Sequence, residues 1–336
     1  MQKPIILHTL GVLCCIGTFT CSATAQELHA SANITLPATV IASEDVSGIA
    51  RLGSSLLVVS DEASEHNENV LQVLNAKHEL TATIPLLTGD EVDLEGLAVE
   101  GRTVYAIGSH SSKRKRIKAD KSYRKNLKSY RDDAIKDEAG RDFVFRVRFD
   151  KHGAVVNTAQ ISLHDVIQNS PVLTTFSRIP SKENGVDIEG LAVRDGWLYA
   201  GFRGPVFRGN RVPVLRFNFD HPTQDAQLLF VTLGGRGIRG ITEVSDGFLL
   251  LAGPVGDGDG SYRIYHWDGN DTTPGKKRHG MPWGQVQLLG ELVVPVGQKA
   301  EGVTLMQESP QTYQLLIAYD NAKQRDRIVQ RFDVRR

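Results

Sequence analysis

The chain has 336 residues, and its 39 lysines and arginines balance its 39 aspartates and glutamates, so the formal net charge is zero. This balance gives no global electrostatic field that would favour nucleic acid or a membrane surface as a partner. All three cysteines, Cys14, Cys15 and Cys21, lie near the N-terminus. The remainder of the chain therefore has no disulfide, no thiol nucleophile and no thiolate metal site.

Residues 1–25 have the pattern of a cleaved secretory signal. Lys3 precedes an apolar run that ends at Ile16, and Ala23-Thr24-Ala25 is a small-x-small pattern of the kind that signal peptidase accepts. The alternatives are a membrane anchor, for which the apolar run is too short because about 20 residues are needed, and a lipid anchor on Cys21. We expect a periplasmic or secreted protein without a membrane span, in which residues 26–336 form a single domain.

After the predicted signal, one strand-turn-strand unit occurs five times. The two clearest copies begin Asp93-Leu94-Glu95-Gly96-Leu97-Ala98 and Asp187-Ile188-Glu189-Gly190-Leu191-Ala192, and weaker copies begin at Ser47-Gly48, Arg239-Gly240 and Glu301-Gly302. A strand unit repeated roughly every 50 residues indicates a β-propeller, in which each unit forms one four-stranded blade. The predicted fold class is therefore all-β, a β-propeller with five blades.

One interval between the repeat glycines leaves room for a sixth blade. The glycines at 48, 96, 190, 240 and 302 are separated by 48, 94, 50 and 62 residues, and six blades are the alternative. The long interval, however, contains the polar residues 111–140, which show no strand alternation. Ten lysines and arginines stand against one carboxylate between Lys113 and Arg131. We predict a basic insertion at about 111–140, helical or mobile, and five blades.

The last unit lacks a fourth strand. Its third strand, residues 328–334, runs almost to the C-terminus, whereas residues 28–36 alternate like a half-buried strand before the first full unit. We predict that this N-terminal strand pairs in the last blade, which closes the ring and covers an exposed sheet edge. We also expect the protein to be a monomer.

Charged residues mark the start of the inner strands and the end of the second strands. In a meandering blade these two places lie on the same rim, so the side chains of successive blades should converge at one mouth of the central channel. Carboxylates gathered there would suit Ca²⁺ or another divalent cation, a histidine could transfer protons, and arginines could hold an anion. The candidates are Glu95, Glu189 and Glu301 as metal ligands, His110 as catalytic acid or base, and Arg203, Arg208 and Arg239 as substrate-binding residues.

Each of these residues also has a structural interpretation. The glutamates could accept hydrogen bonds from adjacent blades, while the glycines that follow them permit close packing at the axis. Asp257 and Asp259 resemble the start of a calcium loop, but Tyr262 stands where such a loop needs glycine. No Gly-x-Ser-x-Gly elbow, His-Glu-x-x-His motif or Walker loop occurs. Ordinary serine hydrolases, zinc proteases and nucleotide hydrolases are thereby disfavoured.

Five motifs in order, over roughly residues 46–320, resemble the bacterial family catalogued as domain of unknown function 3616. The resemblance implies a secreted β-propeller and brings no assigned catalytic residues. The Glu-Gly start of the inner strand is also similar to the phytase-like esterase and calcium-dependent lactonase propellers, in which a glutamate so placed binds metal. The motifs are Asp93-Leu94-Glu95-Gly96-Leu97-Ala98, Gly108-Ser109-His110-Ser111, Gly201-Phe202-Arg203-Gly204-Pro205-Val206-Phe207-Arg208-Gly209, Gly234-Gly235-Arg236-Gly237-Ile238-Arg239 and Leu251-Ala252-Gly253-Pro254.

Two functions stay open at this point. The first is metal-assisted hydrolysis of a small phosphate ester or lactone, with the anionic ligand held at the channel mouth. The second is a non-catalytic binding propeller whose rim loops recognise a periplasmic protein, glycan or polyanion. Nucleic acid is not expected as a partner, because the predicted location is outside the cytoplasm and the basic run lacks an interleaved aromatic platform.

Overall fold

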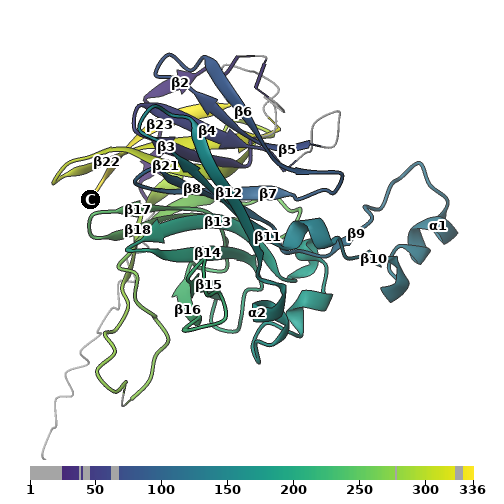
Figure 1. The fold of residues 1–336 in the computed structure, drawn as a ribbon. Helices are drawn as coiled ribbons and strands as arrows, with labels where there is room; N and C mark the ends of the chain where they lie inside the picture. The colour runs from purple at the N-terminus through teal and green to yellow at the C-terminus, as the bar shows by residue number, and fades with distance from the viewer. Residues whose placement is uncertain (1–24, 38, 41–45, 62–67, 277, 322–327) are drawn as a thin grey trace, which may run out of the picture.

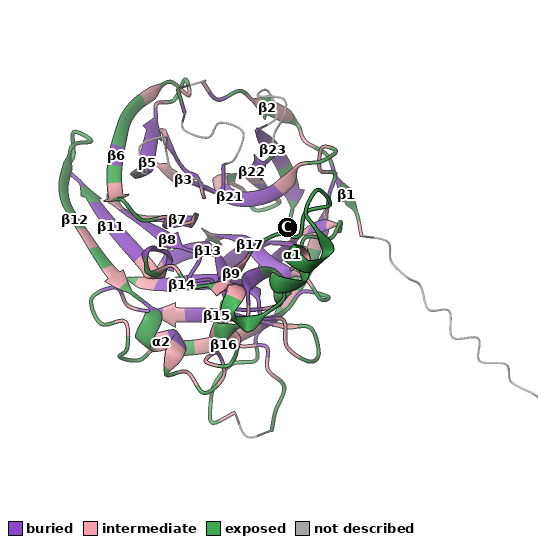
Figure 2. Ribbon diagram, turned by 90° about the vertical axis from the view of Figure 1, so that its right-hand side faces the viewer, coloured by how far each residue is buried: buried purple, intermediate pink, exposed green. Residues whose placement is uncertain are grey.

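The computed structural model describes residues 25–37, 39–40, 46–61, 68–276, 278–321 and 328–336. The predicted signal peptide therefore lies outside the described residues, apart from Ala25. The described chain forms five blades around a central axis (Figure 1), which confirms the five-bladed β-propeller. Burial follows the radius of the disc: the inner strands are mostly buried, whereas the outer strands β6 (Leu80–Thr88) and β12 (Val155–Ser162) are largely exposed (Figure 2).

Each blade is an antiparallel meander that runs outward from the axis. The first blade comprises β3 (Gly48–Leu52), β4 (Ser55–Val59), β5 (Glu68–Leu74) and β6 (Leu80–Thr88). The second comprises β7 (Leu94–Glu100), β8 (Thr103–Gly108), β11 (Phe143–Phe149) and β12 (Val155–Ser162). The third comprises β13 (Asp187–Arg194), β14 (Trp197–Gly204), β15 (Arg211–Phe217) and β16 (Gln227–Thr232). The fourth comprises β17 (Gly237–Val244), β18 (Gly247–Gly253), β19 (Tyr262–Trp267) and β20 (Val286–Leu292).

The last blade joins both ends of the chain. Its strands β21 (Lys299–Glu308), β22 (Thr312–Asp320) and β23 (Val329–Arg335) are completed by β2 (Ala32–Ile34) from the N-terminal segment. Strand β2 pairs antiparallel with β23, as the sequence predicted. One feature was not foreseen: β1 (Glu27–Leu28) adds to β20 in parallel, at the outer edge of the fourth blade. The N-terminal segment therefore spans two blades and covers two sheet edges.

The long interval between the second and third inner strands holds no sixth blade in the described chain. Its first part is an excursion between β8 and β11 that we call the basic arm, residues 113–136, which projects from the disc (Figure 1). Short helices fill the remainder on either side of β11 and β12. The elements are β9 (Lys113–Arg114), α1 (Tyr123–Lys128), η1 (Asp132–Ala134), β10 (Ile135–Lys136), η2 (Ala139–Asp142), α2 (His164–Gln168), η3 (Phe176–Arg178) and η4 (Ser181–Glu183).

The repeat glycines form the waist of the channel. A Cβ on Gly96 would lie 2.8 Å from the Leu191 backbone nitrogen, and a Cβ on Gly190 would lie 2.9 Å from the Ile241 side chain. A Cβ on Gly240 or Gly302 would likewise come too close to the inner strand of the next blade. Only a residue without a Cβ lets the inner strands approach so closely. The space left at this level has a volume of about 10 Å³, roughly that of one water molecule.

Apolar side chains between adjacent blades make up the core. Between the third and fourth blades, for example, the ring centroids of Tyr199 and Phe248 lie 4.5 Å apart. The ring centroids of Phe248 and Trp267 lie 5.3 Å apart. Aromatic pairs at such separations add to the stabilisation from apolar burial. Within the described residues, no helix has the length and apolar character needed to cross a membrane.

Candidate functional site

A ring of one residue per blade surrounds the channel just above the glycine waist. Each member directly precedes a repeat glycine, and four of the five are the extra residue of a bulge in the pairing of the inner strand with the second strand. A bulge turns the extra side chain out of the regular alternation. Each of these four bulges therefore places one charged side chain on an inner strand that is otherwise mostly apolar and buried. The ring is Ser47, Glu95, Glu189, Arg239 and Glu301, in blade order.

Arg239 neutralises the two glutamates beside it in the ring. Its guanidinium donates to Glu189 on one side and lies 3.2 Å from Glu301 on the other, and all three side chains are buried. Burial raises the pKa of Glu301 to about 7, although Arg239 opposes that rise. The predicted anion-binding arginine is thus occupied by carboxylates of the protein itself.

Arg203 supplies the second buried cation. It lies at the end of β14 and pairs with both Asp187 and Glu189. Burial raises the pKa of Asp187 to about 7 even with this arginine in contact, and the nearby carboxylates add to the rise. Asp187 and Glu301 can therefore gain or lose a proton close to neutral pH.

Glu95 differs from the other two glutamates of the ring. Its neighbours there are Glu189 and Ser47, and the Ser47 hydroxyl donates to the Leu94 carbonyl. Glu95 is only 8% exposed, and among the residues that the structure describes its carboxylate has no hydrogen bond or ion pair. Burial raises the pKa of Glu95 well above its ordinary value, and the surrounding carboxylates raise it further. The ring therefore lacks a cation on this side.

Two aspartates complete a carboxylate cluster around Glu95. One carboxylate oxygen each from Asp61, Asp93 and Glu95 lie within 4.8 Å of one another. Asp61 follows β4 of the first blade, whereas Asp93 precedes β7 of the second and is held by Arg141 at 2.7 Å. Carboxylates this close repel one another unless a proton or a cation compensates. Oxygen ligands of this kind suit Ca²⁺ or Mg²⁺.

The cluster lies in a pocket of about 600 Å³ whose walls are basic. Arg203 and Lys299 border it from inside the propeller, and residues 113–117 of the basic arm form one side. A second hollow of about 380 Å³ adjoins it beside residues 256–262. The mouth thus combines an acidic floor with cationic walls. Such a site can hold a metal ion and a small anion next to each other.

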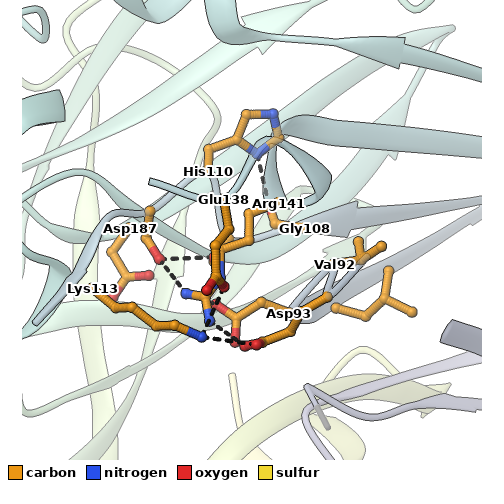
Figure 3. A network of polar contacts seen from close by, with 12 residues as sticks. Val92, Asp93, Gly108, His110, Lys113, Glu138, Arg141 and Asp187 are labelled. Carbon is orange, nitrogen blue, oxygen red and sulfur yellow. Dashed lines mark hydrogen bonds and ion pairs between the residues drawn. The ribbon is translucent and has the colours of Figure 1, made fainter. Parts of the chain in front are cut away.

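His110 does not reach this pocket. Its backbone is left-handed (φ 53°), and its Nδ1 is 2.8 Å from the Gly108 carbonyl. The ring points away from Asp93 and Arg141 (Figure 3). Burial lowers the pKa of His110, and the negative charge of Asp142 partly opposes this decrease. The sequence brought His110 to the rim through its place after β8, but the left-handed turn directs its side chain elsewhere.

The other predicted residues are divided between the two hollows and the outer surface. Glu95, Glu189, Glu301 and Arg203 line the large pocket, and Arg239 borders the smaller hollow. Arg208 is exposed on the loop after β14 and lines neither of them. The structure therefore unites the three glutamates with Arg203 and Arg239 but separates them from His110 and Arg208.

Several residues at the mouth were not among the predicted site residues. Lys299 occupies the position that Asp93 and Asp187 hold in their repeats, two residues before the ring position, so aligning the units would have revealed it. Arg141 pairs with Asp93 and Glu91 from the end of the insertion. No repeat or motif marks Arg141, so no sequence signal pointed to it.

Comparisons with known proteins show the family and little else. The family model described as "Protein of unknown function (DUF3616)" matches residues 45–335. No curated protein matches the chain. Among solved structures, Bacteroides ovatus Xyloglucan PUL GH43B is similar with a TM-score of 0.43 and 13% identity, over 90% of this chain and 52% of that one. The exo-beta-1,3-galactanase from Phanerochaete chrysosporium has a TM-score of 0.43 and 8% identity, over 90% and 63%. This chain thus spans about half to two thirds of those proteins.

Proposed function

The chain belongs to the DUF3616 family of proteins of unknown function. From the geometry of its channel mouth we propose that it binds a divalent cation together with a small ester, which it hydrolyses. The cation ligands are Asp61, Asp93 and Glu95. The esters in question are small phosphate esters or lactones, and the site of action is the periplasm or the cell exterior.

The observation that carries this proposal is the position of Glu95. It is a buried carboxylate without a pairing cation among the described residues, it lies at the floor of a pocket, and two aspartates are within 4.8 Å. Arg239 of the ring pairs with Glu189 and Glu301, and Arg203 beside the ring also pairs with Glu189, but neither arginine forms an ion pair with Glu95. A divalent ion would supply the missing charge. Glu189 and Glu301 then have a different role from the one expected, because they hold Arg203 and Arg239 in place.

The walls of the pocket suit the second part of the proposal. A cation on the acidic floor would polarise a carbonyl or phosphoryl oxygen and lower the pKa of a bound water. Arg203, Lys113 and Lys299 border the same space. Each pairs with a carboxylate of the protein, and its remaining N–H groups would donate to the anionic group of the substrate. Asp187, whose pKa is about 7, also lines the pocket.

The first experiment is a metal titration of residues 26–336 after removal of bound ions. Calorimetry and thermal melts with Ca²⁺, Mg²⁺, Mn²⁺ and Zn²⁺ should find one ion that binds and stabilises, by about 2.7 kcal/mol at a concentration of 100 times Kd. Glu95→Gln should abolish this stabilisation. The matched control is Glu291→Gln, a carboxylate on β20 that pairs with Arg263 away from the mouth. Wild-type ion binding by Glu95→Gln would refute the proposed metal site.

The second experiment tests turnover with p-nitrophenyl phosphate and a simple lactone in the presence of the ion that binds. Hydrolysis that is lost in Glu95→Gln and retained in Glu291→Gln would support the hydrolase. Ion binding without any turnover would favour the second candidate, a binding propeller for an anionic partner. The observation that supports this candidate is the charge of the basic arm, where six of the ten lysines and arginines between Lys113 and Arg131 have no ion pair with the described residues.

A further inference from the structure

The basic arm is ordered by its own hydrogen bonds, yet its helix buries nothing. The Arg114 guanidinium donates to the carbonyls of Ser129 at 2.8 Å and Arg131 at 2.9 Å, and the Asn126 amide donates to the Lys118 carbonyl at 2.9 Å. In contrast, α1 has no buried residue, and all of its residues except the half-buried Asn126 are exposed (Figure 2). Helices in proteins are stabilised mainly by packing of one face. The arm therefore presents an ordered surface that the propeller does not cover.

Most of the positive charge on this surface is uncompensated. Ten lysines and arginines lie between Lys113 and Arg131, and four of them form ion pairs with carboxylates. The other six have no ion pair within the described ranges. They are Lys115, Arg116, Lys118, Arg124, Lys125 and Lys128.

Large apolar side chains lie among these cations. Tyr123 is 75% exposed and Leu127 is 46% exposed, and their spacing of four residues places them on one face of α1. Tyr130, 62% exposed, follows less than one turn later. Exposed aromatic and aliphatic side chains flanked by lysines and arginines are typical of helices that lie in a membrane interface.

We propose that the basic arm docks the protein on an anionic lipid surface. Tyr123 and Leu127 enter the boundary between headgroups and acyl chains, and the six unpaired cations contact lipid phosphates. A soluble polyanion would use the cations but would leave Leu127 exposed, so the apolar face favours a lipid surface. A second copy of the chain is disfavoured as the occupant, because two arms of the same charge repel each other.

The docked orientation brings the channel mouth close to the lipid headgroups. Lys115, Arg116, Ile117 and Tyr130 of the arm also line the large pocket. The pocket would therefore open beside the surface on which the arm rests. This inference concerns binding alone and does not depend on any hydrolysis at the mouth.

The test is co-sedimentation of residues 26–336 with vesicles. Binding is expected to phosphatidylcholine vesicles that contain phosphatidylglycerol, and not to pure phosphatidylcholine. Arg124→Gln with Lys125→Gln and Lys128→Gln should weaken binding by roughly 100-fold, because each cation near an anionic surface contributes about a fivefold factor. Tyr123→Ser with Leu127→Ser should also weaken binding while the charge stays constant.

Matched controls distinguish binding through this surface from non-specific binding of vesicles by exposed side chains elsewhere. Lys77→Gln with Arg148→Gln and Lys151→Gln removes three exposed cations outside the arm, one from the turn after β5 and two from the end of β11 and the turn that follows it. Val155→Ser with Val156→Ser removes two exposed apolar side chains from β12. Both should bind vesicles like the wild type. Lack of vesicle binding by the wild type would overturn the proposal. The proposal would also be overturned, in favour of a polyanion, by two results together: vesicle binding that Tyr123→Ser with Leu127→Ser does not weaken, and equally tight binding to soluble heparin.

Discussion

Replacing Arg239 by methionine should destabilise the propeller in a manner that depends on pH. The side chain is 2% exposed and pairs with Glu189 and Glu301, and Arg203 remains for Glu189 but not for Glu301. Removing one partner of a buried ion pair costs about 3–5 kcal/mol. For a domain of this size, that corresponds to a loss of about 6–10 °C in Tm, at about 2 °C per kcal/mol.

The sign of the pH dependence follows from Glu301. Burial raises its pKa to about 7 in the folded protein, whereas an unfolded glutamate titrates at about 4.3. The folded state therefore binds more protons between these values, and the stability that this carboxyl contributes is present at low pH and is lost as pH rises through its raised pKa. Without Arg239 this pKa rises further. The penalty of Arg239→Met should thus be smaller at about pH 5, where the carboxyl is protonated in both proteins, than at about pH 8, by up to about 1.4 kcal/mol because pH 8 is one unit above the wild-type pKa.

The assay is thermal unfolding of wild type and variant, followed by circular dichroism at these two pH values. Arg236→Met is the control, since Arg236 precedes the same strand but donates to the Ser261 carbonyl at 2.9 Å rather than to a carboxylate. It should lose a similar small amount at both pH values. An equal loss of Tm for Arg239→Met at pH 5 and pH 8 would refute the reasoning that an uncompensated carboxylate causes the loss.

Three further predictions concern the waist, the cluster and the closure of the ring. Gly96→Ala places a Cβ 2.8 Å from backbone and should cost about 1–3 kcal/mol in urea unfolding, whereas Gly258→Ala, with nothing within 4 Å, should not destabilise; equal values would argue against the close packing. In metal-free buffer at about pH 8, Glu95→Gln should raise Tm, because it removes a buried charge that lies close to other carboxylates; a lowered Tm would count against that repulsion. Deleting residues 26–34 removes β1 and β2 and should lower the urea midpoint and promote association through the uncovered edges, as light scattering would show; an unchanged midpoint would mean that ring closure contributes little.

The sequence predicted the blades and their closure because both depend on local patterns. Strand alternation and the repeated Glu-Gly pair are visible without any tertiary information, and the missing fourth strand pointed to the N-terminal segment. The sequence also placed Glu95, Glu189 and Glu301 on one rim. It did not show which glutamate pairs with which arginine, because that depends on the direction of each side chain at the rim. Arg239 pairs with the ring glutamates on both of its sides, and Arg203 reaches Glu189 from the end of β14, which leaves Glu95 without an arginine partner among the described residues.

The cluster of carboxylates was harder to predict for a related reason. Asp61 and Asp93 come from different blades, and they meet only because the end of β4 packs beside the start of β7. The direction of a side chain within a turn was equally inaccessible. His110 occupies a rim position in the sequence, but its left-handed backbone turns the imidazole away from the mouth.

The glycine waist has a consequence for how ligands exchange. With about 10 Å³ at the level of the glycines, nothing larger than a water molecule passes along the axis. The mouth is therefore a blind vestibule, and whatever enters it must leave by the same opening. A product would occupy the entrance that the next substrate needs, so inhibition by product should be competitive. In the part of the chain that the structure describes, the glycine waist separates the opposite face of the disc from the carboxylates, so substitutions on that face should leave ligand binding at the mouth unchanged.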